Sequence, residues 1–97
     1  MKVIWSQLAI DRAQEESAFI AQDKPGAALR WIEDLFAAVD RLETFPESGP
    51  IVPEIGLSNY RQLPFGTHRV VYRLDPSIVY ILTVRRFKQL LRLAEIE

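Results

Sequence analysis

The segment from about residue 25 to 43 has the clearest periodicity in the chain, and it constrains the fold more than any other feature. Its apolar side chains recur every three or four residues and form one stripe, made of Ala28, Ile32, Leu35, Phe36, Val39 and Leu42. Charged residues such as Arg30, Glu33 and Asp40 occupy the opposite side. This pattern predicts an amphipathic helix with one buried face. The rest of the chain must therefore supply an apolar surface for that face to cover.

A second helical segment precedes the first, from Gln7 to about Gln22. Apolar or small residues recur there with helical spacing, at Ile10, Ala13, Ser17 and Ile20. Ser6 is placed to cap its first turn. Only Asp23-Lys24-Pro25 separates the two segments, and proline is tolerated in the first turn of a helix. Two helices joined by so few residues are expected to form an antiparallel hairpin.

The remaining segments have the pattern of β-strands. Residues 1–5 are long enough only for a short strand, and residues 45–56 form a loop rich in proline and glycine. Three strand signals follow, at residues 59–64, 69–74 and 78–84, with a turn at residues 65–68. The order strand, two helices, three strands predicts an α+β fold (β-α-α-β-β-β), in which the helical hairpin packs on one face of a mostly antiparallel sheet.

The chain is expected to form a single domain over residues 1–97, with residues 86–97 as a C-terminal tail or short helix.

Along residues 69–74 the side chains alternate, with Val70, Tyr72 and Leu74 on one face. Arg69 and Arg73 then point together away from the helices, and Arg61 is expected to join them from the neighbouring strand. These arginines are either a binding surface or a solvated sheet face with acidic partners.

Charge is distributed unevenly along the chain. Residues 1–59 carry five basic and ten acidic groups, whereas residues 60–97 carry seven basic and three acidic groups. Such asymmetry indicates either a basic face that meets an acidic partner or arginines that keep a sheet soluble.

Several classes of function are disfavoured by composition. There is no cysteine, which excludes disulfides, thiolate metal sites and a cysteine nucleophile. No His/Asp/Glu cluster has metal-ligand spacing and no glycine-rich phosphate loop is present, so we expect neither a metal nor another cofactor. The start of the chain lacks a secretory signal and no stretch is long enough to cross a bilayer, so a cytoplasmic protein without a membrane partner is expected.

Five stretches, in this order and spacing, resemble the RelE/ParE toxin superfamily of type II toxin–antitoxin systems, and especially its ParE-like members. They are the helix junction DKPGAA (23–28), the loop LETFPESG (42–49), the strand pair YRQLP (60–64) and RVVYR (69–73), and the last strand with its basic end, VYILTVRR (79–86). The similarity covers essentially the whole chain.

The resemblance implies the toxin of a two-gene module, often connected with plasmid stabilization, and a cognate antitoxin that wraps an extended segment across it. It also implies one of two activities: ParE-like members inhibit DNA gyrase without being nucleases, and RelE-like members cut mRNA in the ribosome. A degenerate module that retains only antitoxin binding is a third reading. The oligomer, a homodimer or a toxin–antitoxin hetero-oligomer, is left open.

A metal-free ribonuclease needs a base, an acid and cations that stabilise the phosphorane. Arg61 and Arg69 match basic positions of RelE-like nucleases, and His68, the only histidine, is the candidate acid or base. However, Phe87 stands where these proteins tend to carry a further arginine, and Leu93 lies near the expected catalytic tyrosine. Because arginine is a poor proton shuttle, the nuclease set looks incomplete.

A ParE-like toxin that acts by binding is therefore the preferred hypothesis. The candidate residues for binding the target or the antitoxin come from the basic second half of the chain. They are Arg61, Arg69, Arg73, Arg85, Arg86, Phe87 and Lys88.

Overall fold

The computed structural model describes residues 1–96, which form two helices and one four-stranded sheet. In chain order the elements are β1 (Lys2–Trp5), α1 (Gln7–Ala21), α2 (Pro25–Asp40), β2 (Tyr60–Phe65), β3 (His68–Leu74) and β4 (Ile78–Arg86). Short 3-10 turns at Arg41–Glu43 and Leu93–Glu95 complete the structure. The predicted α+β order is confirmed.

The two helices begin and end close to the predicted positions. The Ser6 hydroxyl caps α1 by accepting a hydrogen bond from the Ala9 amide at 3.0 Å. Pro25 lies in the first turn of α2, as expected. Within the predicted stripe Leu35, Val39 and Leu42 are completely buried. Phe36 is predicted to be buried with them but is 44% exposed, because it lies at the margin of the stripe, where its ring packs against Trp5 in a T-shaped arrangement.

The strands are ordered β1-β4-β3-β2. β2, β3 and β4 form an antiparallel meander, whereas β1 pairs with β4 in parallel. The turn between β2 and β3 contains only Gly66 and Thr67, and Gly66 has a positive φ of 59° that favours glycine. β4 lies in the middle of the sheet, which agrees with its nearly continuous apolar sequence.

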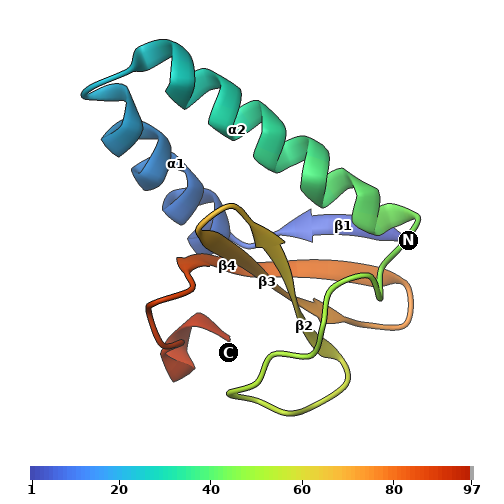
Figure 1. Ribbon diagram of the computed structural model, residues 1–97. Helices are drawn as coiled ribbons and strands as arrows, with labels where there is room; N and C mark the ends of the chain where they lie inside the picture. The colour runs from blue at the N-terminus through green and yellow to red at the C-terminus, as the bar shows by residue number, and fades with distance from the viewer. Residues whose placement is uncertain (97) are drawn as a thin grey trace.

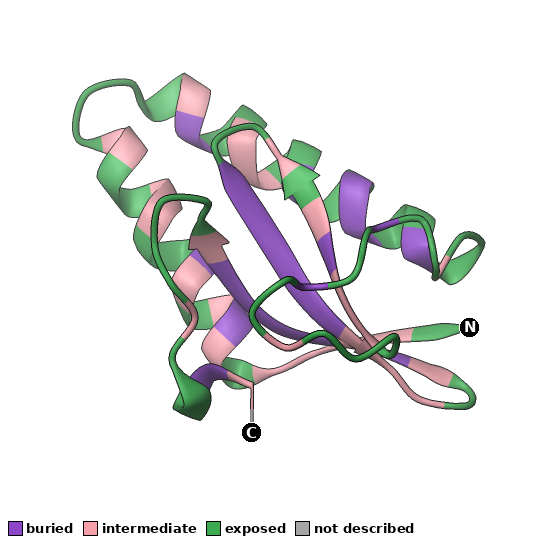
Figure 2. Ribbon diagram, turned by 60° about the horizontal axis from the view of Figure 1, so that its bottom comes forward, coloured by how far each residue is buried: buried purple, intermediate pink, exposed green. Residues whose placement is uncertain are grey.

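The two faces of the sheet have different covers (Figure 1). Both helices pack on one face, here called the helix face, over a cluster that includes Leu35, Val70, Tyr72 and Ile81. The loop before β2 and the C-terminal tail (residues 87–96) lie over the other face, here called the tail face. A smaller cluster of Val52, Val71 and Leu82 is buried there. β3 and β4 are consequently buried along most of their length (Figure 2).

A β-bulge in β4 changes which side chains reach each face. Val71 pairs with Thr83 and Tyr72 pairs with Ile81, so Leu82 has no partner in β3. Val84 therefore joins Ile81 on the helix face, whereas Leu82 and Thr83 both lie on the tail face. Beyond the bulge, Arg85 lies on the tail face and Arg86 on the helix face.

Candidate functional site

Arg69 is buried on the tail face and is held by internal partners. Its guanidinium forms a bidentate ion pair with Glu54 of the loop, with 2.8 Å between Nη1 and Oε1. It also donates to the side chain of Gln62 at 2.9 Å and to the backbone oxygen of Gln89 at 3.0 Å. Hydrogen bonds from Arg69 lower the pKa of the Glu54 carboxyl to about 2. Only 4% of Arg69 is exposed.

Arg85 is the neighbour of Arg69 across the strand pair and is bound in a similar way. Its Nη2 donates to the backbone oxygen of Leu90 at 3.1 Å, and its Nε lies 3.4 Å from the Glu95 carboxylate. Glu95 is itself buried and accepts a hydrogen bond from the Thr83 hydroxyl at 3.1 Å. The tail face thus contains two arginines that already hold carboxylates and carbonyls of the same chain.

Arg61 and Arg73 do not join this pair, so the predicted cluster of Arg61, Arg69 and Arg73 is wrong. Arg61 pairs in register with Tyr72 and therefore lies on the helix-face side, where it donates to the backbone oxygens of Ser58 (3.0 Å) and Gly49 (3.1 Å). Arg73 lies on the tail-face side but at the far end of β3, where it forms two hydrogen bonds with Asp75. Those bonds raise the pKa of Arg73 above its ordinary value.

His68 is expected in the turn at residues 65–68, but in the structure it is the buried first residue of β3. Its Nε2 lies 3.4 Å from the Glu16 carboxylate of α1, and its ring packs against Trp31 in a T-shaped arrangement. Arg86, its partner in β4, forms an ion pair with the same carboxylate at 3.1 Å. His68 therefore faces the helices, whereas the next residue, Arg69, faces the tail.

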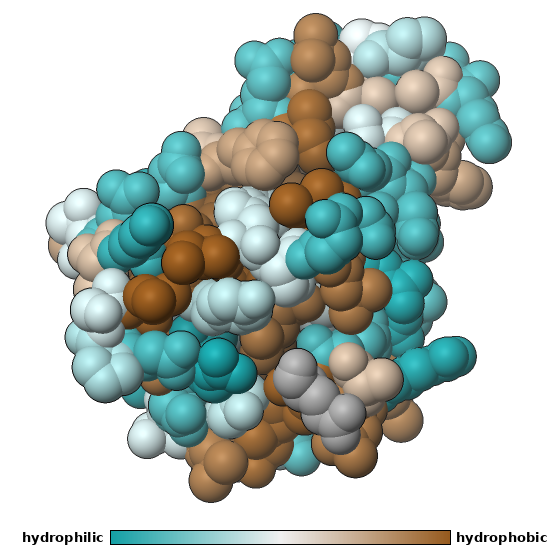
Figure 3. Space-filling view, turned by 180° about the vertical axis from the view of Figure 1, so that it is seen from behind, coloured by the Kyte–Doolittle hydropathy of each residue, from teal (hydrophilic) through white to brown (hydrophobic). Residues whose placement is uncertain are grey.

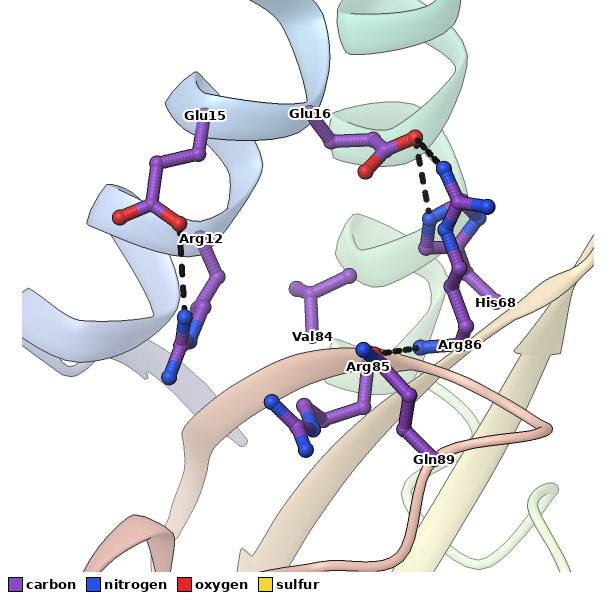
Figure 4. Close-up of a pocket in the computed structure, with 8 residues that line it drawn as sticks. All are labelled: Arg12, Glu15, Glu16, His68, Val84, Arg85, Arg86 and Gln89. Carbon is purple, nitrogen blue, oxygen red and sulfur yellow. Dashed lines mark hydrogen bonds and ion pairs between the residues drawn. The ribbon is translucent and has the colours of Figure 1, made fainter. Parts of the chain in front are cut away.

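A polar pocket of about 150 Å³ lies beside this cluster, between α1 and the end of β4 (Figure 4). In the figure Glu16 points toward both His68 and Arg86, and Arg12 and Arg85 lie on the far side of the pocket. The complete lining is Arg12, Glu15, Glu16, His68, Val84, Arg85, Arg86 and Gln89. The acidic residues Glu16, Glu54 and Glu95 were missed by sequence reasoning, because nothing local marks a carboxylate that pairs with a distant strand.

The exposed residues among those predicted to bind a partner lie at the end of β4 and at the start of the tail. Phe87 is 44% exposed and Lys88 is also exposed. The apolar residues of the tail have helical spacing, but residues 87–96 contain no α-helix. Their one helical element is the 3-10 turn Leu93–Glu95. The exposed apolar side chains on the tail and the loop are Phe45, Ile51, Leu57, Phe87, Leu90 and Leu93. Figure 3 shows brown, apolar side chains at the lower end of the molecule, which is the side of the loop and the tail.

Within residues 1–96, no group of three His, Cys, Asp or Glu side chains is arranged to hold a metal ion. Neither helix in this part of the chain is long and apolar enough to span a membrane.

A helical hairpin on one face of a mixed sheet, with basic residues at the end of its last strand, places the chain in the RelE/ParE class of folds. Three solved structures share it, each at 19% sequence identity. The chromosomal ParDE system of P. aeruginosa has a TM-score of 0.76 and covers 89% of this chain and 95% of that one. The RelBE2 complex of Mycobacterium tuberculosis has a TM-score of 0.61, and the match covers 88% of this chain and 95% of that one. The YoeB/ParE toxin of Agrobacterium tumefaciens has a TM-score of 0.59, and the match covers 89% of this chain and 98% of that one.

The family model for the ParE toxin of the type II toxin–antitoxin system parDE matches residues 3–91. The chain therefore belongs to the ParE toxin family within the RelE/ParE superfamily. A search of curated protein sequences finds no significant match.

Proposed function

We propose that the chain is a toxin that binds and inhibits a cellular target, DNA gyrase, and that a cognate antitoxin neutralises it. Both are proposed to meet it in the cytoplasm. Support for an inhibitor that acts by binding comes from the match to the ParE toxin family over residues 3–91. An antitoxin partner is supported by two similar structures, the ParDE system of P. aeruginosa and the RelBE2 toxin–antitoxin complex of Mycobacterium tuberculosis.

One structural observation weighs against a ribonuclease. The candidate proton-transfer residue, His68, faces α1 and α2, whereas the cation expected to assist it, Arg69, is buried on the opposite face with Glu54. General acid–base catalysis needs these groups within reach of one phosphodiester. Arg61, the third member of the proposed set, is bound to backbone oxygens at the loop before β2. The three residues therefore do not converge on one substrate.

The exposed residues that remain for target binding are those at the end of β4 and the start of the tail. Arg86 has a half-exposed side chain, and Phe87 and Lys88 follow it. A cation next to an exposed aromatic ring is a common composition for the energetic centre of a protein interface. We assign target binding to these three residues.

The test is a supercoiling assay with purified gyrase and relaxed plasmid. The wild-type chain should inhibit supercoiling, and the double variant Phe87→Ala/Lys88→Ala should need at least tenfold more protein for the same inhibition. Lys2→Ala, at the other end of the sheet, is the matched control and should behave as wild type. Full supercoiling at a large excess of the wild-type chain would contradict gyrase as the target.

The runner-up is a ribosome-dependent mRNA endonuclease, which is favoured by the similarity to the RelBE2 complex. Primer extension on mRNA from cells that express the chain separates the two functions. New 5′ ends that depend on the chain would support the nuclease and overturn the binding toxin.

A further inference from the structure

Two adjoining pockets lie where the helical hairpin meets the end of β4. β1 pairs with β4 only as far as Ile81, so beyond that residue the edge of β4 is left to α1. One pocket is the polar one of about 150 Å³, and the other, of about 530 Å³, lies between the hairpin and the turn that joins β2 to β3. Glu16, His68 and Arg86 line both pockets. The larger volume falls within the range of about 300–1,000 Å³ that is usual for small-molecule sites.

The polar pocket is lined by side chains whose buried nitrogen atoms lack partners. His68 is only 6% exposed, and its Nε2 has no hydrogen-bond partner among residues 1–96. The buried Nε atoms of Arg12 and Arg85 are unpartnered in the same part of the chain. Both guanidinium groups approach one oxygen of Glu95, at 3.8 Å and 3.4 Å, without donating a hydrogen bond to it. Because a buried donor without an acceptor is destabilising, this pocket suits an anion that supplies several acceptor oxygens.

The larger pocket supplies an apolar wall. Trp31 and Phe65 pack in a T-shaped arrangement with 5.7 Å between their ring centroids, and Ile20 of α1 extends the wall. All three side chains are partly exposed. Aromatic side chains are the usual platform for a nucleobase, since every base has a flat apolar face.

Glu16 lies between the two pockets. Its contacts with His68 and Arg86 are both made by Oε1, and its other oxygen is directed into the polar pocket (Figure 4). A carboxylate repels a phosphate but accepts hydrogen bonds from hydroxyl groups, as acidic residues do from ribose in dinucleotide sites. The two pockets together thus offer an apolar wall, then an acceptor, then a group of cations.

We propose that these two pockets form one site that binds a nucleoside monophosphate. The base lies against Trp31 and Phe65, the ribose hydroxyls donate to Glu16, and the phosphate accepts hydrogen bonds from Arg12 and Arg85. The polar pocket is too small for a second nucleoside beyond the phosphate, so the ligand is a single nucleotide. The site does not require gyrase to be the target, and Arg12 is not among the residues assigned to target binding.

The first experiment measures the fluorescence of Trp31. The chain has two tryptophans, so Trp5→Phe leaves Trp31 as the only one. Adenosine monophosphate should quench it saturably, whereas adenosine and inorganic phosphate should each bind at least tenfold more weakly. Titration calorimetry on the wild-type chain provides the same comparison without a substitution. Absence of saturable binding of adenosine monophosphate to the wild-type chain would overturn the inference, and equal affinity for inorganic phosphate would overturn the assignment of a nucleotide.

The second experiment removes one cation from the site. Arg12→Gln should weaken the binding of adenosine monophosphate about tenfold, and its circular dichroism should remain that of wild type because the side chain is 32% exposed. Arg41→Gln is the matched control, since it makes the same change at an exposed arginine just after α2 and should bind as wild type. Equal affinity in Arg12→Gln and wild type would overturn the site.

A twelve-nucleotide RNA is the last arm of the test. Tighter binding of this RNA than of adenosine monophosphate, with the same loss in Arg12→Gln, would overturn the assignment of a single nucleotide. The supercoiling assay keeps the two proposals apart. Inhibition of gyrase without nucleotide binding would overturn only the nucleotide site, and nucleotide binding with full supercoiling would overturn only gyrase as the target.

Discussion

At the scale of single residues, two arginines of β3 show how position changes a role. Arg69 and Arg73 are expected from alternation to lie on the same side of the sheet, and they do so. Arg69, however, lies under the loop and the tail, whereas Arg73 lies at the margin, where its side chain is 29% exposed. Because Arg69 is buried, its side chain contributes to the stability of the fold. The partly exposed side chain of Arg73 contributes much less to that stability.

Removal of Arg69 should therefore destabilise the protein, not merely weaken binding. Arg69→Ala leaves the Glu54 carboxylate and the Gln89 oxygen without their partner, so we expect a loss of about 3 kcal/mol in the free energy of unfolding. Arg73→Ala should cost less than about 1 kcal/mol, because its pair with Asp75 is partly exposed. Urea unfolding followed by circular dichroism measures both, and equal midpoints for the two variants would contradict the distinction.

At the scale of elements, a glycine and a tyrosine bring the start of the loop before β2 close to the sheet. The buried Tyr72 hydroxyl donates to the Pro46 oxygen at 2.8 Å and accepts from the Gly49 amide at 3.1 Å. A Cβ at Gly49 would lie 2.4 Å from the backbone oxygen of Gln62. The loop can approach β2 so closely only because residue 49 has no side chain. This contact explains the glycine that ends the LETFPESG stretch.

Gly49→Ala should consequently force the loop away from β2 and reduce stability by about 2 kcal/mol or more. Gly26→Ala is the matched control, because a Cβ there meets only the far end of Arg30 at 3.7 Å. Alanine is also the better helix former at that position in α2, so a small gain of up to about 1 kcal/mol is expected. Thermal unfolding of the two variants provides the comparison, and a stable Gly49→Ala protein would refute the close approach.

The bulge in β4 is a second feature at this scale. Strict alternation from Ile81 would send Arg85 toward the helices and Arg86 toward the tail. The unpaired Leu82 reverses this assignment. Arg85 can therefore bind the tail, while Arg86 reaches Glu16 on α1.

At the scale of the whole molecule, the two covers of the sheet differ in how they are held. The helix cover rests on a large apolar cluster with one group of ion pairs at its edge, around Glu16. The loop and tail cover combines a small apolar cluster with the ion pairs of Arg69 and Arg85. Apolar burial is nearly insensitive to pH, but a carboxylate–guanidinium pair is not. The pair of Glu54 and Arg69 in the tail-face cover should therefore lose its contribution to stability in acid.

The pKa of Glu54 determines the pH range over which this contribution to stability is lost. Its folded pKa of about 2 lies below its ordinary value of 4.5, so the folded state binds fewer protons than the unfolded state between these values. The stability it contributes is fully present above about pH 4.5 and is lost as the pH falls toward 2. Allowing for the exposed part of the carboxylate, this contribution is about 2 kcal/mol at neutral pH.

Urea unfolding at pH 6 and pH 3 therefore separates wild type from Glu54→Gln. Wild type should lose more stability between the two values, because only wild type has a carboxylate to protonate at this position. An identical loss in both proteins would show that Glu54 is not the responsible group. Glu33→Gln, which removes an exposed carboxylate, should behave as wild type.

The amino-acid sequence by itself determined the helical hairpin, the four strands, their packing and the resemblance to the superfamily, because amphipathic periodicity and turn residues are local properties of a chain. It also indicated which residues of β3 reach the helix face, since alternation along a regular strand is local too. Only the tertiary structure decided which arginines are available to a partner. Glu54, Glu95 and Glu16 come from segments 15, 10 and 70 positions away from the arginines they hold, and no local pattern encodes the partner of a buried charge.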